Sequence, residues 1–326
     1  YFSGKEEVQL RREPLPPLKS GEVLVRSLYS AVSAGTELLF YCGQAPENMA
    51  VDESISSLSG KIEYPLKYGY AVAGEITAAA KGLDPQLAGK RIFAFHPHQS
   101  HFIASLQNLI ILPEEIEPRE AVFLANMETA VNLLLDGAPL LGERVAVTGL
   151  GIVGILTTAL LSRFPLNQLL AVDLHQKRRE IAKTMGTLQA SEHLETVKEH
   201  SGFDLIFELS GNPAALNDAI QAAAYDGRIV VGSWYGSKPA SLELGGPFHR
   251  RRLKLISSQV STIAPALRGR WNKQRRLGMA LQLLGEIQPE RLISHEFNFE
   301  EAPRAYRLLK DAPQEALQVV FKYADE

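Results

Sequence analysis

The residues with the clearest chemical meaning are three glycines, Gly149, Gly151 and Gly154, which follow an apolar run with the spacing Gly-x-Gly-x-x-Gly. In such a turn the first glycine permits a tight exit from a strand, the second lets backbone approach a pyrophosphate, and the third lets a helix pack closely. The helix N-terminus adds N–H groups and a positive potential. This turn, which includes Ile152 and Val153, predicts a dinucleotide site.

An acidic residue follows at the spacing that a ribose requires. Asp173 lies 19 residues after Gly154, where a carboxylate accepts both hydroxyls of an adenosine ribose. The same carboxylate would repel the 2′-phosphate of NADP, so NAD(H) is the favoured cofactor. Lys177, Arg178 and Arg179 follow closely and could bind that phosphate, so NADP(H) is the less favoured alternative, with Arg178 a candidate cofactor contact.

Polar residues also follow two later apolar runs, FDLIFEL and RIVVG. Ser210 and Gly211 come after the first run, and Ser233 and Trp234 come after the second. Ligands of parallel sheets gather beyond the carboxyl ends of the strands. These four residues are therefore expected to contact the cofactor.

The segment FHPHQSH places His96, His98 and His101 close together. If a strand continued through it, His96 and His98 would share one face. No nearby carboxylate or cysteine completes a metal site, so proton transfer is favoured over metal binding. His96 is an acid–base candidate because the imidazole pKa suits neutral conditions, and His98 is a candidate substrate contact.

Positive charge is concentrated in FHRRRLK and RGRWNKQRR. Arginine forms bidentate contacts with carboxylates and phosphates, which makes Arg250 a candidate contact for an acidic or phosphorylated substrate. A solvated helix face or a subunit contact is the alternative interpretation of such runs.

The elements that hold these residues follow from the apolar patterns. Short alternating runs at residues 22–30, 74–77 and 91–95 predict a β-rich first domain. The stretch after Pro113 has acidic residues at its start and apolar residues at helical spacing, which predicts a helix that links two domains.

The second half alternates apolar runs with helix-length segments, which predicts a doubly wound parallel sheet. The expected strands are residues 144–148, 168–172, 204–209 and 228–233. The tail ends in LQVVFKY, which could pair with either sheet.

Length and composition suit a protein of two domains with a ligand cleft between them. The 326 residues carry a formal net charge of -3, which offers no field for recruiting nucleic acid. The single cysteine, Cys42, cannot form an internal disulfide, and with no signal-like start we expect a cytoplasmic protein. Residues 145–161 are apolar but contain three glycines, so a strand, turn and helix is favoured over a membrane span.

Five segments, taken in their order along the chain, carry a resemblance to a known family. They are PLPPLKSGEVLVRSLYSAVSAGTE, YPLKYGYAVAGEI, GERVAVTGLGIVG, FDLIFELSGNPAAL and EFNFEEAPRAYRLLKD. Together these segments resemble the medium-chain dehydrogenase/reductases, with a more distant likeness to the bacteriochlorophyllide a dehydrogenases, which share a SAGTE-like phrase. The resemblance implies a GroES-like β-barrel catalytic domain at 1–125 and 272–326, a Rossmann NAD-binding domain at 126–271, and a homodimer joined through the latter.

Zinc-bearing members of that family hold the catalytic metal with a cysteine, a histidine and a further cysteine or glutamate. The matching places here carry Ala34, Tyr70 with Ala71, and Leu124, which cannot complete the expected ligand set. The structural zinc lobe needs four cysteines, which a chain with one cysteine lacks. The resemblance therefore implies a protein without either zinc.

Without a metal, side chains must move the proton that accompanies a hydride. Thr36 matches the hydroxyl that relays a proton in the family, and Tyr70 could direct its phenol at the reacting oxygen or merely fill the vacated cavity. Glu37 could pair with an arginine near the cofactor. The family also brings the helix around Asn126, Glu128 and Thr129 against the nicotinamide, where Glu128 would orient a substrate or stabilise the helix start.

The leading hypothesis is a zinc-independent, NAD(H)-dependent oxidoreductase that acts on an alcohol or carbonyl of a small molecule. An NADPH-dependent quinone or enone reductase is the second hypothesis, since zinc-free relatives often reduce activated double bonds. The third is a nucleotide-binding sensor without catalysis.

Overall fold

The computed structural model describes residues 1–46, 49–187, 189–195 and 202–324. The chain divides into two compact units, Tyr1–Ala125 with Leu284–Glu326, and Asn126–Leu283. The resemblance placed the return to the first unit at residue 272, whereas the units separate inside helix α7 (Lys273–Ile287). This helix is continuous, and its last turn lies against Ile116 of the first unit, beside Gly285.

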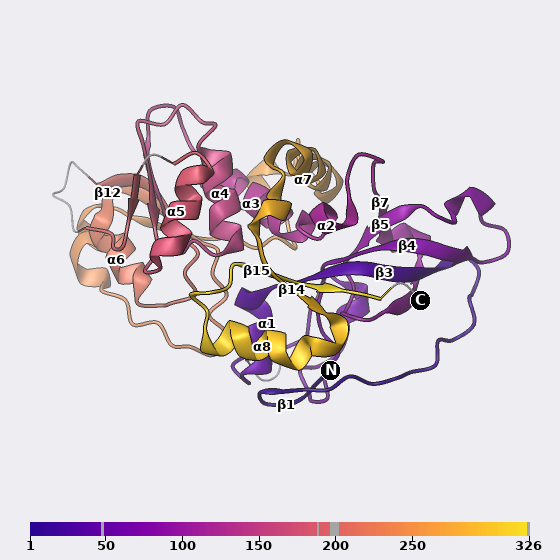
Figure 1. The fold of residues 1–326 in the computed structure, drawn as a ribbon. Coiled ribbons are helices and arrows are strands. Elements are labelled where there is room, and N and C mark those ends of the chain that lie inside the picture. Colours follow the sequence, from indigo (N-terminus) through magenta and orange to yellow (C-terminus); the bar gives the residue numbers. More distant parts are fainter. Residues whose placement is uncertain (47–48, 188, 196–201, 325–326) are drawn as a thin grey trace. The chain divides into compact units, whose positions relative to one another are not determined.

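The second unit contains the predicted doubly wound sheet, whose strands are all parallel in the order β10-β9-β8-β11-β12-β13. Figure 1 labels β12 of this sheet and the helices of the same unit. The order reverses between β8 and β11, and ligands of such sheets bind beyond this point. The strands are β8 (Arg144–Thr148), β9 (Gln168–Val172), β10 (Gln189–Ser191), β11 (Phe203–Glu208), β12 (Ala223–Val231) and β13 (Lys254–Ser257).

Four helices of this unit connect or cover the strands. They are α3 (Leu124–Gly137), which starts just before the unit boundary, α4 (Ile152–Leu161), α5 (Gln176–Thr184) and α6 (Ala215–Ala222). Strands β8 and β9 begin and end where the apolar runs predicted. Strand β12 begins earlier than expected, and its register shifts around Asp226, whose backbone φ is 58°.

The first unit is built around the antiparallel strand β3 (Glu22–Val32), whose residues alternate between half-buried and buried as far as Leu28 and are all buried from Ser30 to Val32. Its sheet has the order β14-β15-β3-β4-β5-β7, and β6 also pairs with β3. The other elements are β1 (Phe2–Gly4), β2 (Glu7–Val8), α1 (Ala34–Tyr41), β4 (Val72–Ala79), β5 (Arg91–Ala94), β6 (His101–Ser105), β7 (Leu109–Ile111), α2 (Pro118–Ala121), β14 (Ile293–Asn298), α8 (Ala302–Asp311) and β15 (Gln318–Lys322).

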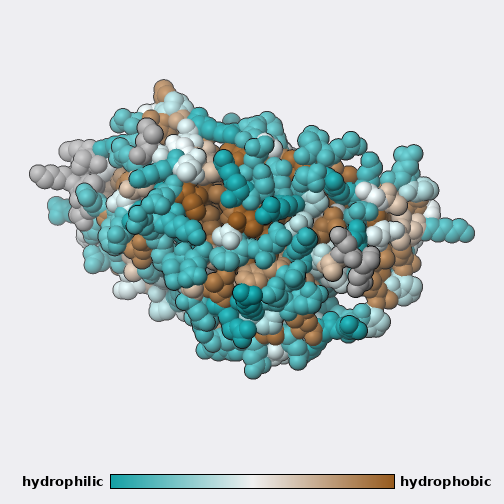
Figure 2. All heavy atoms as spheres, viewed as in Figure 1, coloured by the Kyte–Doolittle hydropathy of each residue, from teal (hydrophilic) through white to brown (hydrophobic). Residues whose placement is uncertain are grey.

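The C-terminal tail joins the first sheet, not the second. Strand β15 contains most of the apolar run LQVVFKY and pairs antiparallel with β3, with Val319 opposite Val32. Among the described residues no helix is long and apolar enough to cross a membrane. The face shown in Figure 2 is mostly hydrophilic, with smaller hydrophobic areas between polar side chains.

Candidate active site

The glycine turn after β8 is packed so tightly that two of its three glycines are required by the fold itself. Gly149 has a backbone φ of +87°, and a Cβ there would lie 2.4 Å from the backbone of Ser210. A Cβ on Gly154 would lie 1.9 Å from the carbonyl oxygen of Gly149. Any side chain at either position would force backbone to move.

Gly151 differs, because nothing in the protein requires it to be glycine. It is the N-cap of α4, and its φ of -65° is accessible to any residue. A Cβ built on it would meet no atom within 4 Å. The backbone therefore faces open space beside the N–H groups at the start of a helix, which is the cradle that a pyrophosphate needs. These residues fit a dinucleotide.

Asp173 follows β9 and ties the glycine turn to the start of α5. The backbone N–H of Leu150 donates to its Oδ2 and that of His175 to its Oδ1, each at 2.8 Å. The Nη1 of Arg178 lies 3.7 Å from Oδ2, and Arg179 donates to the backbone oxygen of Asp173 at 2.6 Å. The carboxylate thus stands beside the turn with an arginine close by.

The turns after β11 and β12 meet beside the glycine turn. The N–H of Gly211 donates to Ser233 Oγ at 2.9 Å, so two of the sequence candidates are in contact. Glu208, which no sequence pattern singled out, is fully buried and accepts hydrogen bonds from Ser210 and Tyr235. A glutamate at the end of an apolar strand was the signal that could have found it. Trp234 lies in the same turn and is 37% exposed.

In the first unit, Tyr70 joins the first turn of α1. Its hydroxyl donates to Ser33 Oγ. Burial is the largest effect and raises the pKa of the Tyr70 phenol, while hydrogen bonds with Ser33 and Thr36 act to lower it. The structure therefore brings the two proton-relay candidates, Thr36 and Tyr70, together with a serine that the sequence analysis did not single out.

Glu37 and His98 form a buried pair beneath this turn. His98 Nε2 lies 3.1 Å from Glu37 Oε2, and His98 Nδ1 lies 2.8 Å from Ser30 Oγ. Both ring nitrogens of His98 are thus engaged inside the unit, an arrangement that does not favour the expected substrate contact. Glu37 pairs with this histidine and with Tyr306, not with an arginine.

His96 does not share a face with His98, because β5 ends at Ala94 and the chain is irregular between the two histidines. The His96 ring stacks on Phe102 with centroids 4.0 Å apart. Burial lowers its pKa from 6.5 to about 4. The expectation of a pKa suited to neutral conditions is therefore wrong for this histidine.

Glu128 lies inside α3 and not at its start. Its Oε1 accepts hydrogen bonds from Nε and Nη2 of Arg276, each at 3.0 Å. Arg276, from the second basic run, is 1% exposed and also donates to Asn132 at 2.6 Å and to the backbone oxygen of Thr262. Glu128 thus holds a buried arginine in place, which weakens the case for a substrate role.

Arg250 is exposed and precedes β13 in the chain. Because β13 pairs parallel with β12, Arg250 lies toward the edge at which the strands begin. The glycine turn lies at the opposite edge, where the strands end. The structure therefore does not bring Arg250 to the cofactor turn.

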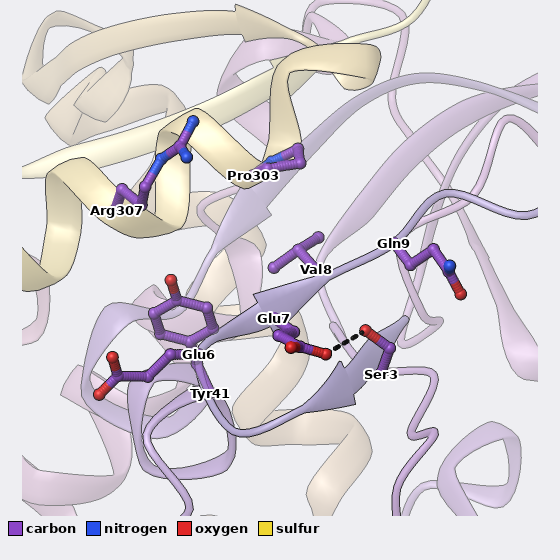
Figure 3. Close-up of a pocket in the computed structure, with 8 residues that line it drawn as sticks. All are labelled: Ser3, Glu6, Glu7, Val8, Gln9, Tyr41, Pro303 and Arg307. Carbon is purple, nitrogen blue, oxygen red and sulfur yellow. Dashed lines mark hydrogen bonds between the residues drawn. The ribbon is translucent and has the colours of Figure 1, made fainter.

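The first unit also has a separate open hollow of about 350 Å³. Figure 3 shows the residues that line it. Its acidic side chains have partners within the unit, since Glu6 pairs with Lys310 and Glu7 Oε2 lies 3.5 Å from Ser3 Oγ. None of the site residues predicted from the sequence lines it. The lining residues are Ser3, Glu6, Glu7, Val8, Gln9, Tyr41, Pro303 and Arg307.

Comparison with known proteins agrees with this architecture. A family model described as zinc-binding dehydrogenase matches residues 153–274. The L-threonine 3-dehydrogenase of Legionella pneumophila (strain Corby) is 30% identical over 245 residues, which cover 67% of this chain and 72% of that protein.

Solved structures extend the likeness in fold to almost the whole chain. Galactitol-1-phosphate dehydrogenase from Escherichia coli has a TM-score of 0.79 at 18% identity and covers 98% of both chains. Acetophenone reductase from Geotrichum candidum NBRC 4597, solved in complex with NAD, has a TM-score of 0.76 at 15% identity and covers 98% of this chain and 95% of its own. With the sequence likeness and the two-unit architecture, these matches confirm the predicted fold class. The chain is an oxidoreductase that belongs to the medium-chain dehydrogenase/reductase superfamily.

Proposed function

We propose that the protein is a zinc-independent, NAD(H)-dependent dehydrogenase or reductase that interconverts an alcohol and a carbonyl compound. The observation that carries the proposal is Gly151, a glycine that the fold does not require and that faces open space at a helix N-terminus. A ligand against the backbone explains its identity, since a methyl group there would stand between the helix start and a phosphate.

Asp173 supports NAD(H) over NADP(H). Its carboxylate is aligned by two backbone N–H groups and retains lone pairs for ribose hydroxyls. A 2′-phosphate at this place would meet a negative charge. Arg178 at 3.7 Å partly offsets that charge, so the preference is expected to be one of degree. The bound nicotinamide would supply the hydride acceptor or donor.

Tyr70 is the group that we propose moves the proton. Because burial raises its pKa, the phenol holds its proton at neutral pH and suits donation to a carbonyl oxygen in the reductive direction. In the structure Tyr70 Oη donates its proton to Ser33 Oγ. When Tyr70 instead donates that proton to a substrate oxygen, the Ser33 hydroxyl can reverse its role and donate to Tyr70 Oη. Thr36 lies within the same group of hydroxyls.

The proposal of zinc independence is supported by the side chains at the positions that the family resemblance matches to zinc ligands. Ala34 has no donor atom, Leu124 is fully buried and apolar, and the hydroxyl of Tyr70 is bonded to Ser33. This set does not fit zinc. Among the described residues no group of three or more histidine, cysteine, aspartate or glutamate side chains is arranged so that it could hold a metal ion.

The test combines cofactor binding with turnover. The purified protein is titrated with NADH and NADPH by nicotinamide fluorescence, and alcohols, aldehydes and quinones are then screened at saturating cofactor with Tyr70→Phe as control. We expect tighter binding of NADH, turnover of an alcohol–aldehyde or alcohol–ketone pair that a chelator does not inhibit, and loss of turnover in Tyr70→Phe. Preference for NADPH with turnover of a quinone would instead favour the NADPH-dependent quinone or enone reductase. Binding of a nucleotide without any turnover would favour the nucleotide-binding sensor.

A further inference from the structure

Glu37 is a carboxylate in a place that strongly disfavours charge. It is fully buried within α1, beside a core that includes Phe40, Tyr41 and Tyr306. Burial of a carboxylate costs several kcal/mol unless donors compensate for the lost water. An apolar residue would fill this place without that cost, so we expect the Glu37 carboxylate to have a functional role beyond packing.

The hydrogen-bond partners of Glu37 show which parts of the unit its carboxylate connects. Its Oε1 accepts the backbone N–H of Ser33 at 2.7 Å. Its Oε2 accepts from Tyr306 Oη and lies 3.1 Å from His98 Nε2. One oxygen thus holds the start of α1, while the other is fixed by two side chains from distant parts of the unit.

Because Glu37 binds the backbone N–H of Ser33, the serine hydroxyl is free to bond to another residue than the helix start. Ser33 is the N-cap of α1, a position where a serine side chain ordinarily accepts a backbone N–H of the first turn. No such cap is formed here. The Ser33 hydroxyl is bonded instead to the Tyr70 phenol, and Glu37 holds the backbone beneath it.

His98 contacts the chain beside Tyr70, the donor of the Tyr70–Ser33 hydrogen bond. Its ring lies against Gly69, the residue before Tyr70, where a Cβ would come within 2.5 Å of His98 Cδ2. Gly69 also has a φ of +113°, a conformation that favours glycine. Ser30 Oγ and the edge of Phe321 hold the ring from other directions.

The Glu37–His98 pair therefore contacts Ser33, one partner of the Tyr70–Ser33 hydrogen bond, and Gly69, the residue that precedes the other partner. We propose that Glu37, aligned by His98 and Tyr306, is a positioning residue that fixes the Tyr70 phenol for proton transfer. This inference rests on the proposed function, in which Tyr70 carries the proton. It assigns no contact with substrate to Glu37 or His98.

The kinetic test uses the alcohol identified in the screen above, with kcat, KM and NADH affinity measured for each variant. Glu37→Ala removes the hold on Ser33 and is expected to lower kcat about 100-fold, as a displacement near 1 Å can do, with NADH affinity unchanged. Glu37→Gln keeps an oxygen for the Ser33 N–H and should recover most of that loss. Glu63→Ala, which removes an exposed carboxylate of the same unit, is the matched control.

A second readout needs no substrate. Subtracting the ultraviolet pH titration of Tyr70→Phe from that of the wild-type protein isolates the ionisation of Tyr70. The negative charge of Glu37 contributes to the raised pKa of Tyr70, so Glu37→Gln should lower that pKa while Glu63→Gln leaves it unchanged. If Glu37→Ala does not fold, Tyr306→Phe in the kinetic assay and this titration replace it.

The outcomes separate the two proposals. Full kcat in Glu37→Ala and in Tyr306→Phe, with a Tyr70 titration unmoved in Glu37→Gln, would overturn the positioning role even if Tyr70→Phe is inactive. Full activity of Tyr70→Phe would instead remove the proton-transfer role of Tyr70 on which the inference rests, and the inference with it.

Discussion

Replacement of Gly151 by alanine should change the affinity for NADH but leave the stability of the ligand-free protein almost unchanged. Two effects on stability oppose each other in the ligand-free protein. The alanine restricts the unfolded chain, which stabilises by about 0.4–1 kcal/mol, but it is a poorer N-cap than glycine by up to about 1 kcal/mol. With no atom within 4 Å of the new Cβ, we expect a net change below about 0.5 kcal/mol and a Tm within about 2 °C of wild type.

Binding of NADH should respond very differently to the same methyl group. The Cβ would stand between the start of α4 and the pyrophosphate and lengthen hydrogen bonds from backbone N–H groups to a charged acceptor. Loss of one such bond costs about 1.5–3 kcal/mol. We therefore expect NADH affinity to fall about 10- to 150-fold, measured by nicotinamide fluorescence.

Gly154→Ala is the contrasting variant. Its Cβ would overlap the carbonyl oxygen of Gly149 at 1.9 Å, so it should destabilise the ligand-free protein by about 1–3 kcal/mol through overpacking. Denaturant titration of both variants measures this difference. Wild-type NADH affinity in Gly151→Ala would refute the reasoning that a ligand explains this glycine, and a large loss of stability would show that the fold requires it.

Three further variants test other parts of the site. Asp173→Ala should weaken NADH binding more than NADPH binding, because it removes the ribose acceptor but leaves Arg178; an equal loss for both cofactors in fluorescence titrations would argue against the ribose contact. Glu128→Ala leaves the buried guanidinium of Arg276 without its carboxylate partner and should cost about 3–5 kcal/mol of unfolding free energy in urea, whereas a cost below about 1 kcal/mol would contradict a structural ion pair. The folded-state pKa of His96, about 4, lies below its ordinary 6.5, so the unfolded state binds more protons between these values and stability is lost as the pH falls from 6.5 toward 4. His96→Gln should reduce that loss in urea titrations at pH 5 and 7, and an unchanged loss would place its origin elsewhere.

The sequence predicted the second unit in detail because its signals are local. Strands β8 and β9 are continuous apolar runs, as expected for strands buried on both faces. Gly149 and Asp173 then follow from spacing within one β-α-β unit. Ser210, Gly211 and Ser233 follow neighbouring strands of the sheet, so their closeness was predictable, whereas the buried Glu208 was not singled out.

The first unit was harder to predict because its polar contacts are not local. Glu37 meets His98 and Tyr306, which lie 61 and 269 residues away in the chain, and no periodicity reports such pairings. His96 and His98 were expected on one strand face, but the strand ended two residues before His96. The second unit contains one such contact as well: Arg276 looked like part of a solvated basic run, but it is buried against Glu128, which lies 148 residues earlier.

The proposed dependence of this oxidoreductase on NAD(H) can be tested without any substrate, by titrating the wild-type protein with NADH and with NADPH under the same conditions. We expect one NADH bound per chain, with an affinity at least about tenfold higher than that for NADPH. Equal affinity for both nucleotides, tighter binding of NADPH, or no binding of either would contradict it.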